Sequence, residues 1–256
     1  MKRALQIEYD LFLIALQFLT RLPVGAAIDF TSAKVSDSAA YYPLVGVCIG
    51  GAGGLCFVVL AWTLPAYIAV WLTVGLLLLA TGCLHEDGFA DMCDGIGGGV
   101  DKDAALNIMR DSRLGTYGVA GLVLLLGVKV ASLSALAPSI VPLALIAGHS
   151  LSRLSAVVVM LTSDYVRSAG AASMVSAGMS HRRLMLLVVT ALLVSLLVII
   201  ALGPRVALGM WLGCAAGHIL TRWQFEKKLG GYTGDCLGAT QQVSEMGLYL
   251  GILICT

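Results

Sequence analysis

The sequence predicts an all-α membrane protein, a polytopic helix bundle with about seven transmembrane helices and an N-terminal helix in the membrane interface. Of its 256 residues, 59% are hydrophobic and only 12% are charged, and the mean hydropathy is +0.92. The chain also holds 30 glycines, a residue that is frequent in transmembrane helices. With a formal net charge of +1 and no basic arm, it is not expected to bind nucleic acid.

Seven apolar stretches are long enough to cross a bilayer, which takes about 17 to 25 helical residues. They lie near residues 41–62, 66–84, 117–136, 142–162, 184–202, 206–222 and 236–255. Residues 5–24 form a shorter apolar run with one polar helical stripe, made of Gln6, Asp10, Gln17 and Arg21. This pattern is typical of an interfacial helix. We expect residues 1–256 to form a single integral membrane domain.

The basic residues outside the predicted spans give the chain an orientation. Only Arg205 falls on the side opposite to all the others. The positive-inside rule places the basic side in the cytoplasm. Residues 85–116, 163–183 and 223–235 lie on that side, so we expect residues 85–116 to form a cytoplasmic loop region.

An acidic motif, HEDGFADMCDG, occupies residues 85–95. Asp87, Asp91 and Asp94 stand at i, i+4 and i+7, which places them within roughly 60° of one another on a helix. Three carboxylates this close repel unless a cation lies among them, and oxygen ligands suit Mg²⁺. The motif therefore predicts a Mg²⁺ site, with Glu86 as a weaker candidate ligand. The alternative is a solvated acidic surface, which the preceding membrane-length apolar run disfavours.

Residues 101–118 form the other long polar region. Arg110 and Arg113 are three residues apart, so a helical turn would aim both guanidinium groups the same way, and Lys102 precedes them. Guanidinium groups match phosphate oxygens, which predicts phosphate binding. The alternative is that these residues are membrane anchors paired with neighbouring aspartates.

Several ionisable residues fall inside predicted spans, where each needs a partner. Lys129, His149 and Arg153 are the cations, and His149 and Arg153 share one helix face. Because Arg153 is near mid-span, we expect it to meet a buried partner or a substrate phosphate. In the last span, one face looks into the protein and is made of Asp235, Gln242 and Glu245. That face could complete the metal site, although Asp235 alone could be a helix N-cap.

Five separated motifs resemble those of cobalamin synthases, the adenosylcobinamide-GDP ribazoletransferase family. They are FLTRLPV at 18–24, YYPLVG at 41–46, HEDGFADMCDG at 85–95, MRDSRLGTYG at 109–118 and GGYTGDCLGA at 230–239. They occur in the family's order and cover nearly the whole chain. One departure is Met92, where a threonine is expected, and it puts in doubt a hydroxyl role at that position only.

The resemblance implies transfer of adenosylcobinamide phosphate from its GDP ester to a ribose hydroxyl of α-ribazole or α-ribazole 5′-phosphate. The products would be GMP and adenosylcobalamin or its 5′-phosphate, the last nucleotide-loop assembly step of cobalamin biosynthesis. Mg²⁺ is the implied cofactor, and the bacterial inner membrane is the implied location, with the active site facing the cytoplasm. The family's acidic motif carries over onto His85, Asp87, Asp91 and Asp94, and its last motif carries over onto Asp235. A homo-oligomer, or a complex with other cobalamin-assembly enzymes, stays open.

Such a displacement needs positive charge at the phosphates and a base for the acceptor hydroxyl. Arg110 and Arg113 are the predicted pyrophosphate ligands, and His85 or Asp235 is the candidate base. Two other functions remain as alternatives. The spaced aspartates loosely resemble those of CDP-alcohol phosphotransferases, and glycine-rich helices with buried charges suit a cation-coupled transporter.

Overall fold

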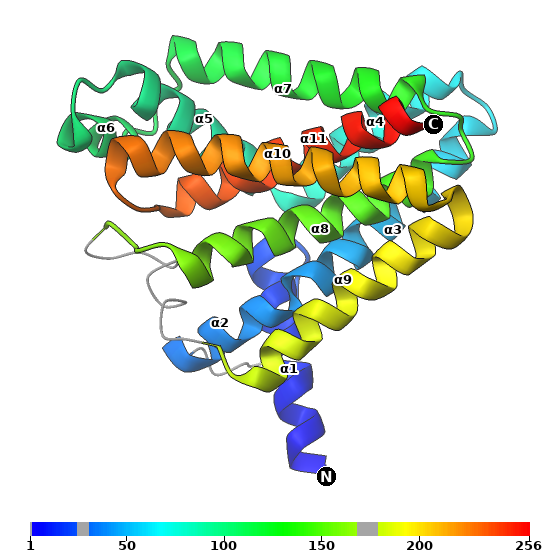
Figure 1. The fold of residues 1–256 in the computed structure, drawn as a ribbon, viewed down its shortest axis with the longest axis horizontal. Coiled ribbons are helices and arrows are strands. Elements are labelled where there is room, and N and C mark those ends of the chain that lie inside the picture. Colours follow the sequence, from blue (N-terminus) through cyan, green and yellow to red (C-terminus); the bar gives the residue numbers. More distant parts are fainter. Residues whose placement is uncertain (1, 25–30, 168–178) are drawn as a thin grey trace.

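The structure, a computed structural model, is all-α, as the sequence predicts. It describes residues 2–24, 31–167 and 179–256, and helices make up nearly all the regular structure in these ranges. The pairing of extended residues found there joins Tyr165 to Tyr232 and is isolated. Figure 1 shows the long helices lying alongside one another, with the short helix α6 (Lys102–Ile108) at one end.

Seven long helices occupy the seven apolar stretches. They are α3 (Tyr42–Ala61), α4 (Ala66–Thr81), α7 (Thr116–Ala135), α8 (Val141–Thr162), α9 (His181–Leu202), α10 (Pro204–Leu229) and α11 (Gly234–Cys255). The predicted and observed ends agree within a few residues, apart from that of α10. This helix continues past residue 222 to Leu229 as a charged extension that no hydropathy pattern marks.

The number of membrane spans is not confirmed as seven. Among the described residues, four stretches are long and apolar enough to cross a membrane: Ala33–Ala61, Thr116–Ala135, Val141–Thr162 and His181–Leu202. A fifth span results if α4 and α5 (Leu84–Gly98), which meet at 88°, are one broken span. Helices α10 and α11 are not among these stretches. Both carry polar residues within their apolar parts, such as Arg205 and His218 in α10 and Gln242 and Glu245 in α11.

A sharp turn between α4 and α5 sets the position of the acidic motif. Gly82 and Cys83 both adopt left-handed backbone conformations, with φ of 66° and 56°. Glycine does so readily, whereas a cysteine there is uncommon. The turn ends α4 at Thr81, before the predicted residue 84, and starts α5 at Leu84. Most of the predicted loop region 85–116 is therefore helical, in α5 and α6.

The N-terminal helix α1 (Lys2–Leu19) runs across the direction of the long helices (Figure 1). It buries Leu11 and Ile14 against the core while Leu5 stays exposed, as an interfacial helix should. It ends at Leu19 rather than at residue 24. The short α2 (Ser32–Ser38) and the 3₁₀ helix η1 (Ala39–Tyr41) then lead into α3.

The two ends of the bundle differ in charge as the orientation argument predicts. One end carries α6, the α10–α11 turn and the segment after α8 (Figure 1). The C-terminus and the turns α3–α4, α7–α8 and α9–α10 lie at the other end, where α10 begins with Pro204 and Arg205.

Helix α11 is the structural centre of the bundle. It packs on α5, α8 and α10, and most of its residues are buried. The close approach of α11 to α10 depends on small residues, because a Cβ on Gly213 of α10 would collide with the carbonyl of Gly247 of α11. Likewise a Cβ on Gly46 of α3 would collide with the carbonyl of His149. These contacts bring the polar residues of α8 and α11 into the interior.

Candidate active site

A cleft of about 290 Å³ opens between α1, α3, α5, α8, the start of α11 and the segment that follows α8. Its walls include Phe18, Tyr42 and Leu237. Its ionisable side chains are those of Tyr42, His85, Asp87, Arg153, Tyr165, Arg167 and Asp235. The cleft therefore joins three of the predicted catalytic residues, His85, Asp87 and Asp235.

The aspartates of α5 become more buried along the helix. Asp87 is exposed and lines the cleft, Asp91 is partly buried one turn later, and Asp94 is buried. The carboxylate of Asp91 lies within electrostatic reach of Asp235, Asp87 and Asp94, all of which repel it. The predicted common face is thus confirmed, and Asp235 from α11 joins it.

Asp94 has a structural role that its spacing does not reveal. One of its carboxylate oxygens accepts the backbone N–H of Gly115 at 2.7 Å, and the other accepts that of Gly118 at 2.9 Å. These are free N–H groups at the start of α7, where a negative charge is also favoured. A Cβ on either glycine would collide with the carboxylate. Asp94 therefore fixes the junction of α5 and α7.

The aspartates are not gathered into a complete metal cage. Within residues 2–24, 31–167 and 179–256, no three His, Cys, Asp or Glu side chains form a group that could hold a metal ion. Glu86 is buried and does not line the cleft. Its Oε1 accepts a hydrogen bond from Gln242 of α11 at 2.7 Å. It is separated from the aspartates because adjacent helical residues point about 100° apart.

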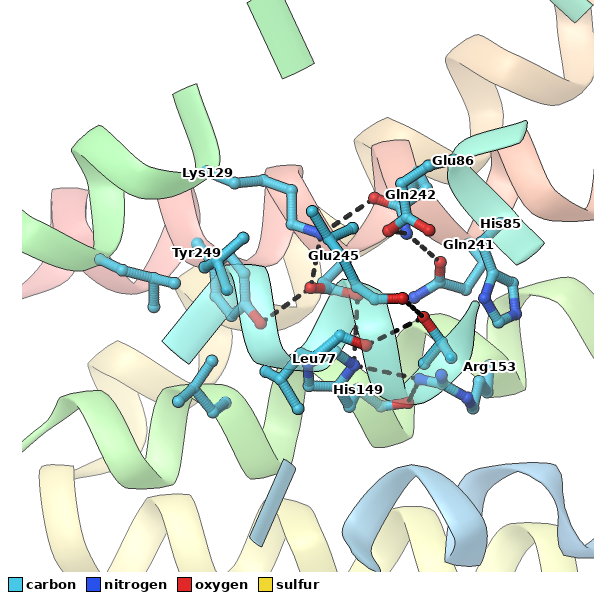
Figure 2. A pocket seen from close by; sticks show the side chains of 15 residues that line it. Leu77, His85, Glu86, Lys129, His149, Arg153, Gln241, Gln242, Glu245 and Tyr249 are labelled. Atoms are coloured by element: carbon cyan, nitrogen blue, oxygen red, sulfur yellow. Dashed lines mark hydrogen bonds and ion pairs between the residues drawn. The ribbon is translucent and has the colours of Figure 1, made fainter. Parts of the chain in front are cut away.

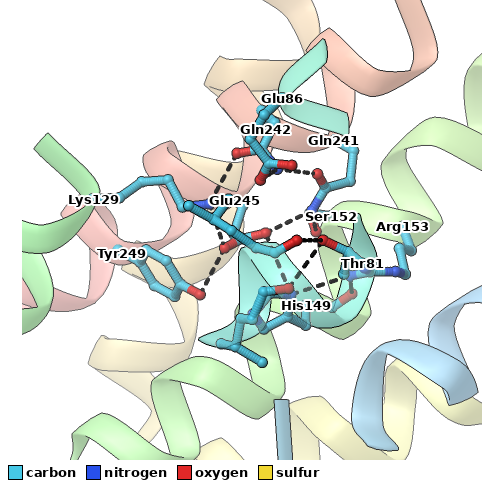
Figure 3. Close-up of polar contacts among 12 residues, drawn as sticks. Thr81, Glu86, Lys129, His149, Ser152, Arg153, Gln241, Gln242, Glu245 and Tyr249 are labelled. Carbon is cyan, nitrogen blue, oxygen red and sulfur yellow. Dashed lines mark hydrogen bonds and ion pairs between the residues drawn. The ribbon is translucent and has the colours of Figure 1, made fainter. Parts of the chain in front are cut away.

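A buried polar network lies beneath the cleft and supplies partners for Lys129 and His149, two of the three ionisable residues predicted to need them (Figure 3). Lys129 of α7 contacts Glu245 of α11 at 2.8 Å and donates to Gln242 at 2.9 Å. His149 of α8 lies 3.6 Å from the other oxygen of Glu245, and Tyr249 donates to Glu245 at 3.0 Å. Because Lys129 engages both Gln242 and Glu245, these residues do not complete a metal site with Asp235, contrary to the prediction.

A small cavity of about 20 Å³ lies within this network, large enough for one water molecule. Figure 2 shows Lys129 and Tyr249 at one end of it and His85 and Arg153 at the other. His85 and Arg153 also line the cleft. These two side chains therefore separate the inner cavity from the cleft.

Arg167 belongs to the cleft, although from the sequence it counted only among the basic residues that set the orientation. Its Nη2 donates to Asp235 at 2.7 Å and to the carbonyl of Met109 at 3.3 Å. A backbone pairing places it there, since Val166 N–H donates to Tyr232 O and Tyr232 N–H donates to Asp164 O. No local sequence signal reports such a long-range pairing.

The predicted phosphate ligands of the 101–118 region lie apart from the cleft lining. Helix α6 ends at Ile108, so Arg110 and Arg113 do not share a helical turn, contrary to the prediction. Arg113 is 88% exposed and donates to Asp111 through Nε at 3.0 Å. Hydrogen bonds from the side chain and backbone of Arg113 lower the pKa of Asp111. Arg110 and Lys102 are exposed on the same end of the bundle.

Comparison with known proteins agrees with the sequence motifs. Residues 11–253 match the family described as cobalamin-5-phosphate synthase. The adenosylcobinamide-GDP ribazoletransferase of Shewanella piezotolerans is 42% identical over 96% of both chains, and that of Leptothrix cholodnii is 41% identical over 98% of this chain and 97% of its own. The namesake from Ralstonia pickettii is 36% identical over 98% and 97%. No solved structure matches. The chain therefore belongs to the cobalamin-5-phosphate synthase family.

Proposed function

We propose that this protein joins adenosylcobinamide-GDP to α-ribazole or α-ribazole 5′-phosphate, giving adenosylcobalamin or its 5′-phosphate and GMP. The observation that carries the proposal is the family match over residues 11–253, together with relatives of that name that align over nearly their full length. The cleft supports it because it combines carboxylates, a histidine and arginines, the groups that phosphoryl transfer needs.

The reaction is a displacement at the phosphorus that carries the cobinamide group. The acceptor hydroxyl oxygen bonds to that phosphorus, and the bond to the bridging oxygen breaks, so that GMP leaves with the electron pair. The hydroxyl proton needs an acceptor within the cleft, where His85 and Asp235 are the candidates. Asp235 is paired with Arg167 at 2.7 Å, and His85 lines the same cleft, so both stay candidates for this role.

We further propose that Mg²⁺ is the cofactor, held by Asp87 and Asp91. The donor set fits, because these carboxylates repel one another and Mg²⁺ is commonly bound by one or two carboxylates plus substrate phosphates. When bound, the ion would neutralise negative charge on the transferred phosphoryl group and on GMP. Asp94 would act by fixing the end of α5.

The exposed cations Lys102, Arg110 and Arg113 would attract the phosphate-rich donor to this end of the protein. We place this end in the cytoplasm and the protein in the bacterial inner membrane, on the basis of the positive-inside rule. Soluble nucleotide substrates would then reach the cleft directly.

The test is product formation by the purified protein in detergent, supplied with the two half-substrates and Mg²⁺ and no membrane gradient. Our proposal predicts a cobamide and GMP in equal amounts. A CDP-alcohol phosphotransferase or a transporter would form neither, and that result would reject the proposed function.

A further inference from the structure

Arg153 is a buried guanidinium group without a counter-ion of its own. It is 1% exposed, and its Nη1 donates to the carbonyl of His149 at 2.8 Å. Its Nε has no hydrogen-bond partner within residues 2–24, 31–167 and 179–256. Among the described residues no carboxylate lies within ion-pair distance of Arg153. The carboxylate of the neighbouring polar network, Glu245, is paired with Lys129 at 2.8 Å and lies 3.6 Å from His149. Burying a positive charge without a counter-ion costs free energy, and an anion bound to the guanidinium group would offset that cost.

Arg167 brings a second guanidinium group to the same cleft. Asp235 and the carbonyl of Met109 hold its Nη2, whereas its Nε is buried and has no hydrogen-bond partner in the part of the chain that the structure describes. Arg153 lies in the middle of α8 and Arg167 in the segment beyond the end of that helix, and both side chains line the cleft. Two guanidinium groups with donors to spare are suited to binding phosphate oxygens.

The size and polarity of the cleft narrow the choice of ligand. Its volume of about 290 Å³ is at the lower limit of pockets that enclose a drug-sized ligand, roughly 300 to 1,000 Å³. It can therefore take a phosphorylated end of a substrate but not a whole corrinoid. Asp87, a proposed Mg²⁺ ligand, lines the same space. A phosphate held by the two arginines would therefore lie close to the proposed metal site.

We propose that Arg153 and Arg167 form the subsite that holds a phosphate ester of a substrate. This inference rests on the proposed function and deepens it. The ester is either the diphosphate of the donor or the 5′-phosphate of the acceptor. Both present the same oxygen chemistry to the arginines, and kinetics tells them apart.

The kinetic test uses Arg167→Ala and Arg153→Lys in the full-length protein, the second keeping the charge while removing Nε–H. The control is Arg222→Ala, because Arg222 is a partly buried arginine paired with Glu226 at 2.9 Å and lies outside the cleft lining. If the subsite holds the donor, KM for adenosylcobinamide-GDP rises roughly ten- to a hundred-fold with either acceptor. If it holds the acceptor, KM rises for α-ribazole 5′-phosphate and is unchanged for α-ribazole. Unchanged KM values for all three substrates, or equal shifts in the control, would overturn the proposal.

A second test needs no turnover and so stands apart from the proposed function. Inorganic pyrophosphate is added to the purified, Mg²⁺-free protein at matched ionic strength, and the thermal midpoint is measured. Pyrophosphate should raise the midpoint of the wild type and of Arg222→Ala, since a ligand that binds only the folded state stabilises it, and should not raise that of Arg167→Ala. Equal shifts in the wild type and Arg167→Ala would contradict the phosphate subsite, whether or not the enzyme forms a cobamide.

Discussion

At the scale of single residues, the three aspartates of α5 divide into two roles. Asp87 and Asp91 lie at or near the cleft and have no hydrogen bond that occupies their carboxylates within the described residues. Asp94 binds the start of α7 through both oxygens. The i, i+4, i+7 spacing predicted their common face but gave all three the same role.

Asp87→Asn and Asp91→Asn should each abolish turnover while the protein remains inserted and folded. Asparagine keeps the shape but removes the negative charge that a hard cation requires, so metal affinity should fall. The measurement is initial rate against Mg²⁺ concentration. Excess Mg²⁺ should restore part of the activity. Near-normal rates at low Mg²⁺ in both variants would show that these residues do not bind the catalytic ion.

Asp94→Asn should act mainly on stability. One backbone N–H of the Gly115–Gly118 segment would face the amide NH₂ instead of an oxygen, a loss of about 1 to 3 kcal/mol. The free energy of unfolding in detergent measures it, with Asp103→Asn as the control, because Asp103 is exposed on α6. Equal stability of the two variants would refute the capping role.

At the scale of elements, the network between α7, α8 and α11 explains why a polar helix lies at the centre of a membrane bundle. Glu245 of α11 receives Lys129 from α7, His149 from α8 and Tyr249 from its own helix. The polar face of α11, which is unusual for a membrane helix, therefore points into the protein. It is matched by the charge of Lys129 on α7 and by the imidazole of His149 on α8.

Lys129→Met should destabilise the protein by about 3 to 5 kcal/mol, because it leaves Glu245 as a buried charge without its closest cation. Adding Glu245→Gln should recover much of that loss. Unfolding free energies of the two single variants and the double variant form the cycle. Strict additivity would mean that the two side chains do not interact.

The sequence was informative wherever structure depends on local periodicity. The long helices, the common face of Asp87, Asp91 and Asp94, and the inward face of α11 all follow from helical spacing. Contacts between distant segments were not predictable. The pairing of Tyr165 with Tyr232 brings Arg167 to Asp235, and the left-handed turn at Gly82 and Cys83 directs Glu86 inward.

At the scale of the whole molecule, the bundle has one end rich in basic residues and one nearly without them. The cleft is lined by Arg167 and by Gly234 and Asp235 at the start of α11, which belong to the basic end. The number of spans bears directly on orientation, because an odd number between two segments places them on opposite sides.

We expect the C-terminus to lie in the periplasm and α6 in the cytoplasm. A reporter that works only in the periplasm should therefore be active when fused to the C-terminus, and a cysteine introduced in α6 should be labelled from the cytoplasm. This expectation follows from seven spans and the positive-inside rule. Compartment-specific reporter activity is the measurement, with a fusion in α6 as the matched control. Cytoplasmic activity at both positions would mean that one polar helix, α10 or α11, does not cross.

The central claim is that the protein transfers adenosylcobinamide phosphate and releases GMP. It is tested most directly with adenosylcobinamide-GDP labelled at the phosphorus next to cobinamide, incubated with the purified protein, Mg²⁺ and the ribazole acceptor. The account predicts that all the label enters the cobamide and that unlabelled GMP appears in equal amount. Label in the released nucleotide, or no cobamide at all, would contradict it.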